Sequence, residues 1–113
     1  MPYIAIITAQ KLSSIQKETI KSELGRLITI IPTKTEAGLF IDFSDGHSLY
    51  KAGAEVPAAF IDVRLHTKAA LEPKKQFTEA AFALLTRVLG IKPEHMYLTI
   101  AEFDNWGAGG TLL

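Results

Sequence analysis

The stretch AAFIDVRL, residues 58–65, decides the fold of this chain. Aliphatic side chains occupy its odd-numbered positions, whereas Phe60, Asp62 and Arg64 occupy even-numbered ones, and His66 continues this second series. Because successive side chains of a strand point to opposite faces, the alternation predicts a strand with one aliphatic face and one mixed face. The aliphatic face suits a layer of helices, and the mixed face needs a different environment.

Two helical patterns accompany this strand. Ser13, with Gln16 three residues later, is a capping-box signal for a helix over residues 14–31, which Pro32 ends. A second helix starts at Pro73, where a missing N–H costs nothing, and Gly90 is its expected C-cap. Each pattern carries an apolar face at helical spacing: Ile20, Leu24, Leu27, Ile28 and Ile31 in the first, and Phe77, Ala81, Leu84, Leu85, Val88 and Leu89 in the second.

Three further segments predict strands, over residues 2–8, 39–43 and 97–103. The order is therefore β-α-β twice, with pseudo-repeats at about 2–44 and 58–104. We expect an α+β fold in a single domain over residues 1–113, with one sheet and both helices on one of its faces, since such crossovers are right-handed. The other sheet face is either solvated or covered by further copies of the chain.

Composition excludes several classes of function. The chain has 12 basic and 12 acidic residues, and a net charge of zero argues against binding nucleic acid or an anionic membrane. The absence of cysteine excludes disulfides and thiolate catalysis. His47, His66 and His95 lie far apart and lack ligand spacing, so no metal is expected. No stretch reaches membrane length and no signal-peptide pattern is present, which predicts a cytoplasmic protein.

Pro2 is the candidate catalytic residue. If Met1 is removed, the proline ring nitrogen becomes a free secondary amine at the head of an apolar strand. Burial disfavours the charged form of an amine and lowers its pKa, so a buried Pro2 would be a general base near neutral pH. Proline at this position also simply permits methionine removal, and a retained Met1 would acylate the nitrogen.

Taken together, these features resemble the tautomerase superfamily. The Met1-Pro2 opening followed by a strand, the two β-α-β units and the Gly-rich end carry the likeness. The segment QKETI (residues 16–20) and the ending LTIAEFDNWGAGG (residues 98–110) are similar to the 4-oxalocrotonate tautomerase branch. The chain length and the placing of Lys34 and Tyr97 are more similar to the macrophage migration inhibitory factor branch.

The resemblance implies a homotrimer in which three sheets surround a central channel. Its active sites would lie between subunits, each built on the amino-terminal proline, with Tyr97 of a neighbouring subunit as a second catalytic residue that donates to a developing enolate oxygen. Asp42, Asp62 and Arg64 would line the interior with at least one ion pair among them.

The resemblance also implies four substrate-binding residues. Lys34 would bind a carboxylate and lower the pKa of the proline amine, or else be a solvated lysine in the turn after the first helix. Arg64 would grip a carboxylate in bidentate fashion, or pair with Asp62 or Asp42. His66 would contribute a backbone N–H. Trp106, with Phe103, would wall an apolar pocket or pack under the Gly-rich turn.

The expected function is keto–enol tautomerisation of a small 2-oxo acid without a cofactor. Two alternatives remain open: lyase or hydratase chemistry on an unsaturated acid with the same proline, and an oligomeric binding or signalling protein with little catalysis. Departures from the superfamily pattern keep them open. Where the 4-oxalocrotonate branch has an arginine after its first strand, this chain reads Gln10-Lys11-Leu12, and Lys11 cannot replace a bidentate group.

Overall fold

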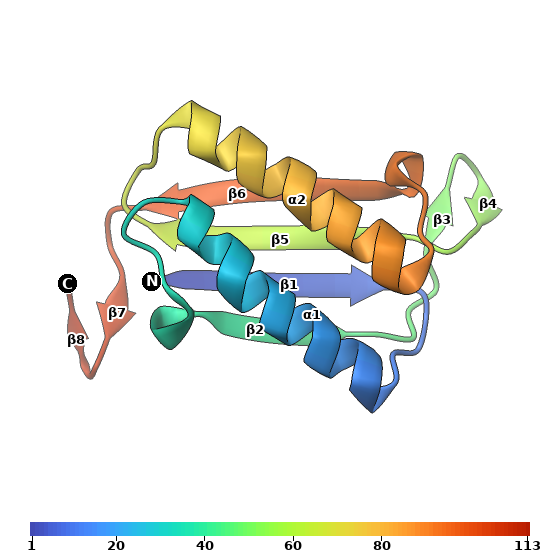
Figure 1. Ribbon diagram of the computed structural model, residues 1–113, viewed down its shortest axis with the longest axis horizontal. Helices are drawn as coiled ribbons and strands as arrows, with labels where there is room; N and C mark the ends of the chain where they lie inside the picture. Colours follow the sequence, from blue (N-terminus) through green and yellow to red (C-terminus); the bar gives the residue numbers. More distant parts are fainter.

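The computed structural model describes residues 1–113, and Figure 1 shows its helices and strands. Two α-helices, eight strands and three short 3₁₀ turns follow one another along the chain. In chain order the helices and strands are β1 (Pro2–Thr8), α1 (Ser14–Leu27), β2 (Phe40–Ser44), β3 (Tyr50–Lys51), β4 (Ala54–Glu55), β5 (Ala59–His66), α2 (Leu71–Leu89), β6 (Met96–Phe103), β7 (Gly107–Ala108) and β8 (Thr111–Leu112).

The four long strands form one sheet in the order β2-β1-β5-β6. Within each β-α-β unit the strands are parallel, β1 with β2 and β5 with β6. The two units meet where β1 pairs with β5 in antiparallel fashion, and this pairing sets Pro2 opposite Leu65. The predicted arrangement of two β-α-β units in one sheet is confirmed.

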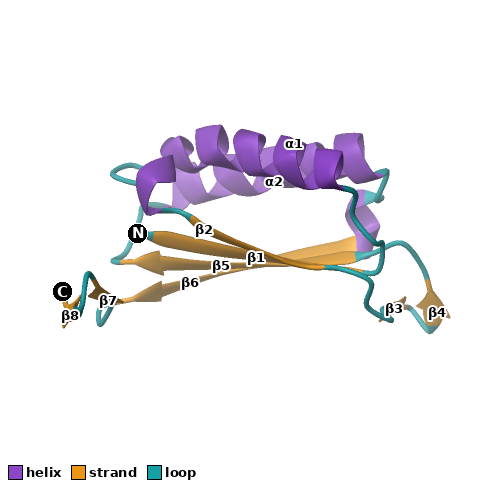
Figure 2. Cartoon of the chain, turned by 90° about the horizontal axis from the view of Figure 1, so that it is seen from below, coloured by secondary structure: helices purple, strands orange, loops and turns teal.

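Both helices lie on the same face of the sheet, as Figure 2 shows from the side. The core fills the space between the two layers, and its strand residues are the aliphatic ones that alternation predicted, including Ile4, Ile61 and Val63. Phe77 of α2 is its largest fully buried side chain. Burial of such a side chain stabilises the fold by about 1.5–3 kcal/mol.

The first helix starts as its sequence predicts but ends earlier. The Ser13 side chain accepts from the Gln16 N–H at 3.1 Å, and the Gln16 side chain accepts from the Ser13 N–H at 2.9 Å, so the capping box is complete. The α-helix ends at Leu27, and residues 28–30 form a 3₁₀ turn in place of the predicted last turn. Pro32 explains the change, because it drives the preceding residue out of helical geometry, and Ile31 is extended.

The second helix begins two residues before Pro73, at Leu71. Pro73 is therefore the third helical residue and not the first, as the sequence suggested. The position is still harmless, since the first four N–H groups of a helix have no intrahelical partner. Gly90 ends the helix in left-handed geometry with φ 70°, as predicted.

Two features of the connections differ from the sequence-based expectation. Strand β2 covers residues 40–44, one residue later than predicted, because a 3₁₀ turn occupies residues 36–38. The joint between the two units, residues 45–57, contains the hairpin β3–β4, which the sequence analysis missed. Its turn residues Ala52 and Gly53 both have positive φ, and alanine gives no signal for such a turn.

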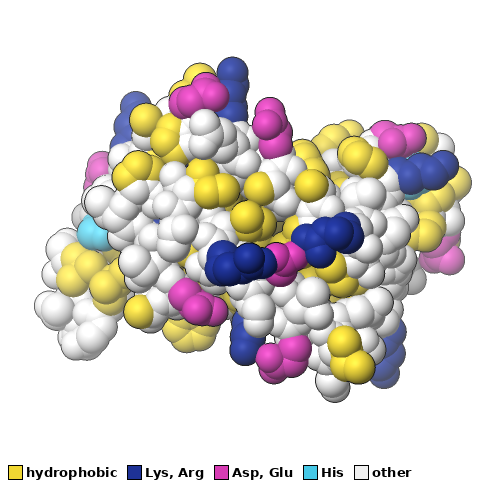
Figure 3. Space-filling view, in the orientation of Figure 1, with side chains coloured by type: hydrophobic (Ala, Val, Ile, Leu, Met, Phe, Trp, Pro, Cys, Tyr) yellow, Lys and Arg dark blue, Asp and Glu magenta, His cyan; other side chains and the backbone are white.

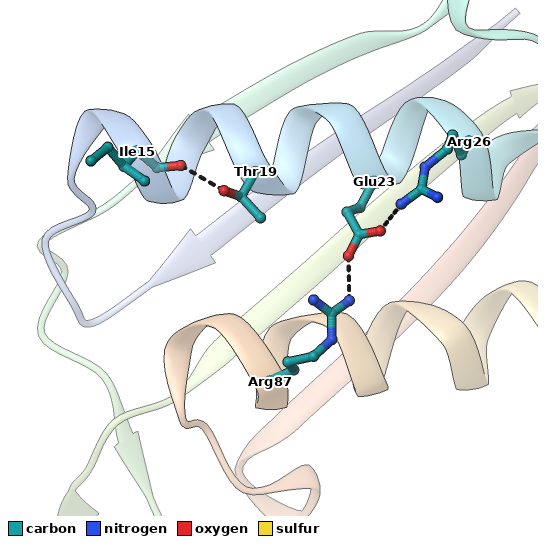
Figure 4. A network of polar contacts seen from close by, with 5 residues as sticks. All are labelled: Ile15, Thr19, Glu23, Arg26 and Arg87. Carbon is teal, nitrogen blue, oxygen red and sulfur yellow. Dashed lines mark hydrogen bonds and ion pairs between the residues drawn. The ribbon is translucent and has the colours of Figure 1, made fainter.

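A polar bridge joins the two helices on their outer side. Glu23 of α1 pairs with Arg26 one turn later and with Arg87 of α2 (Figure 4). In the space-filling view of the helix-covered face, acidic and basic side chains lie interspersed (Figure 3). Neither helix is long and apolar enough to cross a membrane.

Glu102 ties strand β6 to the start of α2 and makes stability depend on pH. Its carboxylate accepts from the Ala69 N–H at 2.6 Å and pairs with Lys74 at 3.0 Å. The backbone hydrogen bond first, and Lys74 second, lower the pKa of Glu102. A carboxyl whose pKa is lower in the folded state stabilises above its unfolded pKa of about 4.3, and this stabilisation is lost as pH falls through the folded value.

We therefore expect Glu102→Gln to destabilise the protein by about 1 kcal/mol at pH 7, a value discounted for partial exposure. The difference from wild type should shrink toward pH 3. Urea unfolding at both pH values measures it. Glu79→Gln, at an exposed position of α2, is the control. An equal loss of stability at both pH values would contradict the ionic role of Glu102.

Candidate active site

A cavity of about 680 Å³ opens at the end of the sheet where β1 begins. The first residues of β1 and the last residues of β5 and β6 meet there, together with the β7–β8 hairpin (Figure 1). The antiparallel pairing of β1 with β5 causes this meeting, because it sets the start of one strand beside the end of the other. The cavity is lined by Met1, Pro2, Tyr3, Gly38, Phe40, Arg64, Phe103, Trp106, Gly107, Ala108 and Gly109.

A buried lysine lies beside the amino terminus. Only 6% of Lys34 is exposed, and its ammonium donates to the carbonyl oxygen of His66 at 2.6 Å. The pKa of the Met1 amine is lowered, by burial first, then by the positive charge of Lys34 and its hydrogen bond. The solvated alternative for Lys34 is wrong, since the side chain is buried in the protein.

Pro2 and His66 complete this end of the site. Pro2 is buried, and its nitrogen is in the peptide bond to Met1. The N–H of His66 donates to the Met1 carbonyl at 3.2 Å, so the His66 backbone contacts Lys34 through its oxygen and the amino-terminal residue through its nitrogen. The sequence anticipated a backbone role for His66, and the structure places that backbone beside Pro2.

Arg64 lies on the cavity wall in a fixed orientation. Its guanidinium pairs with Asp62 at 3.0 Å and lies over the Tyr3 ring, 5.3 Å from the centroid. The Tyr3 hydroxyl donates to Asp42 at 3.0 Å, and this bond raises the pKa of Tyr3. The hydrogen bond to Asp62 raises the pKa of Arg64, which keeps the group charged. The ion pair predicted among these residues is present, between Asp62 and Arg64.

Aromatic rings form the apolar wall of the cavity. The Trp106 ring lies 6.1 Å from the His66 ring and 6.2 Å from the Phe103 ring, measured between centroids. Tyr3 and Phe40 also line the cavity and were missed as site residues. Tyr3 follows Pro2 on the sheet face that carries Arg64, but only the strand register shows that the two are opposite each other.

Tyr97 lies far from this cavity within one chain. It pairs with Phe60 at the other end of β5, five residues from Leu65, the partner of Pro2. At about 3.3 Å per residue, this separation exceeds 15 Å. The ring is 60% exposed and has Lys51 Nζ 5.6 Å from its centroid. The structure therefore does not bring Tyr97 to Pro2 of the same chain.

The site offers amine, ammonium, guanidinium and aromatic groups, and no acidic cluster. No three His, Cys, Asp or Glu side chains lie close enough together to hold a metal ion. Arg64 lines the cavity, and its guanidinium is suited to a small carboxylate. Lys34 acts on the terminal amine, but neither Lys34 nor His66 is among the residues that line the cavity. A group that can accept a proton beside a bound carboxylate is a minimal acid–base site.

Comparison with solved structures identifies the fold. No protein-family model and no curated protein matches the chain. The MIF2 protein of Leishmania major is 24% identical, with 100% of this chain covering 97% of that one at a TM-score of 0.93. A protein inactivated by 2-oxo-3-pentynoate is 19% identical; the match covers 97% of this chain and 94% of that one, with a TM-score of 0.84. A fused 4-OT, an asymmetric trimer, is 15% identical; the match covers 97% of this chain and 94% of that one, with a TM-score of 0.85.

At these identities the likeness shows the fold. It is the fold of the tautomerase superfamily, shared by MIF-like and 4-OT-like proteins, and the fold class predicted from the sequence is confirmed. What these proteins bind or catalyse is a separate matter, because one fold hosts different functions.

We expect Lys34→Met to raise the pKa of the amino-terminal amine, because the variant removes the neighbouring positive charge and its hydrogen bond. Methionine preserves much of the buried volume. An NMR titration of the labelled terminal residue measures this pKa directly. Lys92→Met removes an exposed lysine just before β6, at the opposite end of the sheet, and serves as the control. If the amine pKa is unchanged in Lys34→Met, Lys34 does not lower the pKa of the terminal amine, and the prediction is wrong.

Proposed function

We propose that this protein is a cofactor-free tautomerase of small 2-oxo acids, with the amine of Pro2 as general base after removal of Met1. The environment of the amino terminus carries the proposal. The terminal amine lies at a cavity wall beside buried Lys34, and its pKa is lowered by burial and by that charge. Removal of Met1 would bring the Pro2 nitrogen to this wall as a secondary amine.

The lowered pKa determines the direction of the chemistry. An exposed α-amino group has a pKa of about 7.7–8.0 and is mostly protonated at pH 7. Burial and the Lys34 charge move the Met1 amine toward its neutral form, and a Pro2 amine exposed by removal of Met1 would lie beside the same lysine. A base whose pKa lies near the working pH is the most effective proton carrier. This supports a basic proline, and thus tautomerisation, over the lyase or hydratase alternative with a prolinium acid.

The reaction needs only one proton carrier. In the proposed keto-to-enol direction, neutral Pro2 takes the proton from the carbon next to the carbonyl, and the C–H electron pair moves into the enolate. The prolinium then delivers the proton to the oxygen or to another carbon. The His66 N–H, which loses its Met1 acceptor when Met1 leaves, would stabilise the enolate oxygen. The Lys34 ammonium, bound to the His66 carbonyl, would favour the neutral form of the Pro2 amine.

Arg64 would hold the substrate carboxylate. One edge of its guanidinium faces Asp62, and its other donors remain for a ligand on the cavity wall. Trp106 would cover the apolar part of the substrate. A structural neighbour inactivated by a 2-oxo acid adds support for this class of ligand. We also propose that the protein is cytoplasmic. The chain has no cysteine and so lacks the disulfides that are typical of secreted proteins of this size.

We further propose a homotrimer in which the uncovered sheet face is the interface. Large apolar side chains remain exposed on that face, among them Phe60, Tyr97 and Phe103. Exposed apolar groups gathered on one face favour a protein partner. A second copy is also the only source of a Tyr97 near Pro2, and a fused 4-OT of the same fold is a trimer. The site of one chain would then be completed by another.

The catalytic role predicts a strong loss of activity in Pro2→Ala. The variant has a primary amine of different basicity, and we expect kcat/KM for enol–keto exchange of a compound such as phenylpyruvate to fall about 10²-fold. A spectrophotometric enol-decay assay measures the rate, and intact mass establishes that Met1 is absent. A variant with one extra residue before Pro2 should be inactive. Equal rates in all three proteins would exclude the proline and favour the binding or signalling alternative.

The assembly predicts a trimer in native mass spectrometry. Phe60→Asp places a charge on the proposed interface and should yield monomers and little activity. Ile15→Asp is the matched control, because Ile15 is exposed on α1, on the opposite side of the molecule. A wild type that remains monomeric at micromolar concentration would rule out both the interface and the shared site.

A further inference from the structure

Two threonines next to the candidate active site have left-handed backbone conformations. Thr33 has φ 71° and Thr67 has φ 69°. A β-branched residue at positive φ is a true outlier, since its Cβ crowds the backbone, and glycine avoids the strain. Ala52 is the third non-glycine residue of this kind, with φ 54°, and it lies in the β3–β4 turn at the far end of the sheet (Figure 1).

The two threonines flank a single hydrogen bond. Thr33 precedes Lys34 and Thr67 follows His66, so the strained residues adjoin the donor and the acceptor of the 2.6 Å contact between Lys34 Nζ and the His66 carbonyl. The same His66 bears the N–H that contacts the amino-terminal residue. Backbone strain next to both partners of one contact is the distribution found where strain serves a function.

Backbone hydrogen bonds hold both residues in place. The Lys34 N–H donates to the Ile31 carbonyl at 3.1 Å and closes a turn with Pro32 and Thr33 at its centre. Proline followed by a residue of positive φ is the pattern of a type II turn, whose third position favours glycine. The Thr67 N–H donates to the Phe103 carbonyl at 2.9 Å. The surrounding fold therefore imposes the left-handed geometry.

The threonine side chains have no polar role within the chain. Neither hydroxyl makes a hydrogen bond, and both residues are exposed. Their remaining effect is on the backbone. Glycine would populate several regions of φ and ψ at these positions, whereas a β-branched residue has few alternatives once the fold holds it there. Threonine makes the two turns stiffer at a cost in stability.

We infer that Thr33 and Thr67 are positioning residues that hold the Lys34 ammonium and the His66 backbone against the amine of Pro2. The inference rests on the proposed function of that amine. The ionisable groups around the amine are Lys34 itself, Tyr3 of β1, and Arg64 and His66 of β5. Glu36 packs instead against Gly25 of α1. Lys34 is thus the cation whose placement the two threonines govern.

Glycine variants test this directly. We expect Thr33→Gly and Thr67→Gly each to raise Tm by about 4 °C at equal protein concentration, because strain is released. Both should also raise the pKa of the Pro2 amine, measured by NMR titration, since Lys34 is held less closely. The double variant should lose about tenfold in kcat with a smaller change in KM, because the proton carrier and the enolate-stabilising groups are misaligned.

Ala52→Gly is the matched control. It removes the same kind of strain away from the contact between Lys34 and His66, so Tm should rise while the amine pKa, which reports on that contact, stays at the wild-type value. Site variants with a higher Tm but an unchanged amine pKa would overturn the inference, and so would site variants without a gain in Tm. The titration needs no turnover. If the wild-type protein shows no tautomerase activity but the glycine variants still shift the amine pKa, the proposed function is wrong and the positioning role of the threonines stands.

Discussion

The antiparallel pairing of β1 with β5 is the constraint on which the rest of the structure depends. It joins two parallel β-α-β units into one sheet and places both helices over one face. It also sets the start of the chain beside the end of β5, where His66 and Arg64 lie. A slip of one residue would turn every side chain of β1 to the other face, which the buried Ile4 and Ile6 forbid. Core packing therefore determines the geometry of the site.

A buried cation at this junction has an energetic cost that the fold offsets locally. Removing an ammonium from water is unfavourable unless hydrogen bonds replace its hydration. For Lys34 the His66 carbonyl is the acceptor, and it is itself held in place because β5 lies between β1 and β6. The charge then acts on the neighbouring amine, whose pKa falls. The contact between Lys34 and His66 therefore both stabilises the buried ammonium and sets the position of the charge that acts on the amine. The strained residues Thr33 and Thr67 adjoin its two partners.

The uncovered sheet face is the surface that the proposed assembly would cover. Tyr3, Asp42, Asp62 and Arg64 form a linked polar group there, with aromatic side chains around it. A solvated sheet face has little need for such fixed geometry, whereas an interface with a polar centre uses it. Tyr97 belongs to the same face at the end remote from the cavity. The proposed assembly gives this residue a role that no arrangement within a single chain allows.

The sequence by itself determined the elements and the faces. Alternation in residues 58–65, the capping box at Ser13 and the C-cap at Gly90 depend on neighbours a few positions away, and local physics decides them. It also pointed to Pro2 through the chemistry of a terminal amine, and to Lys34 and Trp106 through the resemblance to a known superfamily. The tertiary structure alone decided that Lys34 is buried against His66, that Tyr3 and Phe40 line the cavity, and that Tyr97 lies at the opposite end. These facts depend on strand register and on contacts between distant residues, which no local pattern encodes.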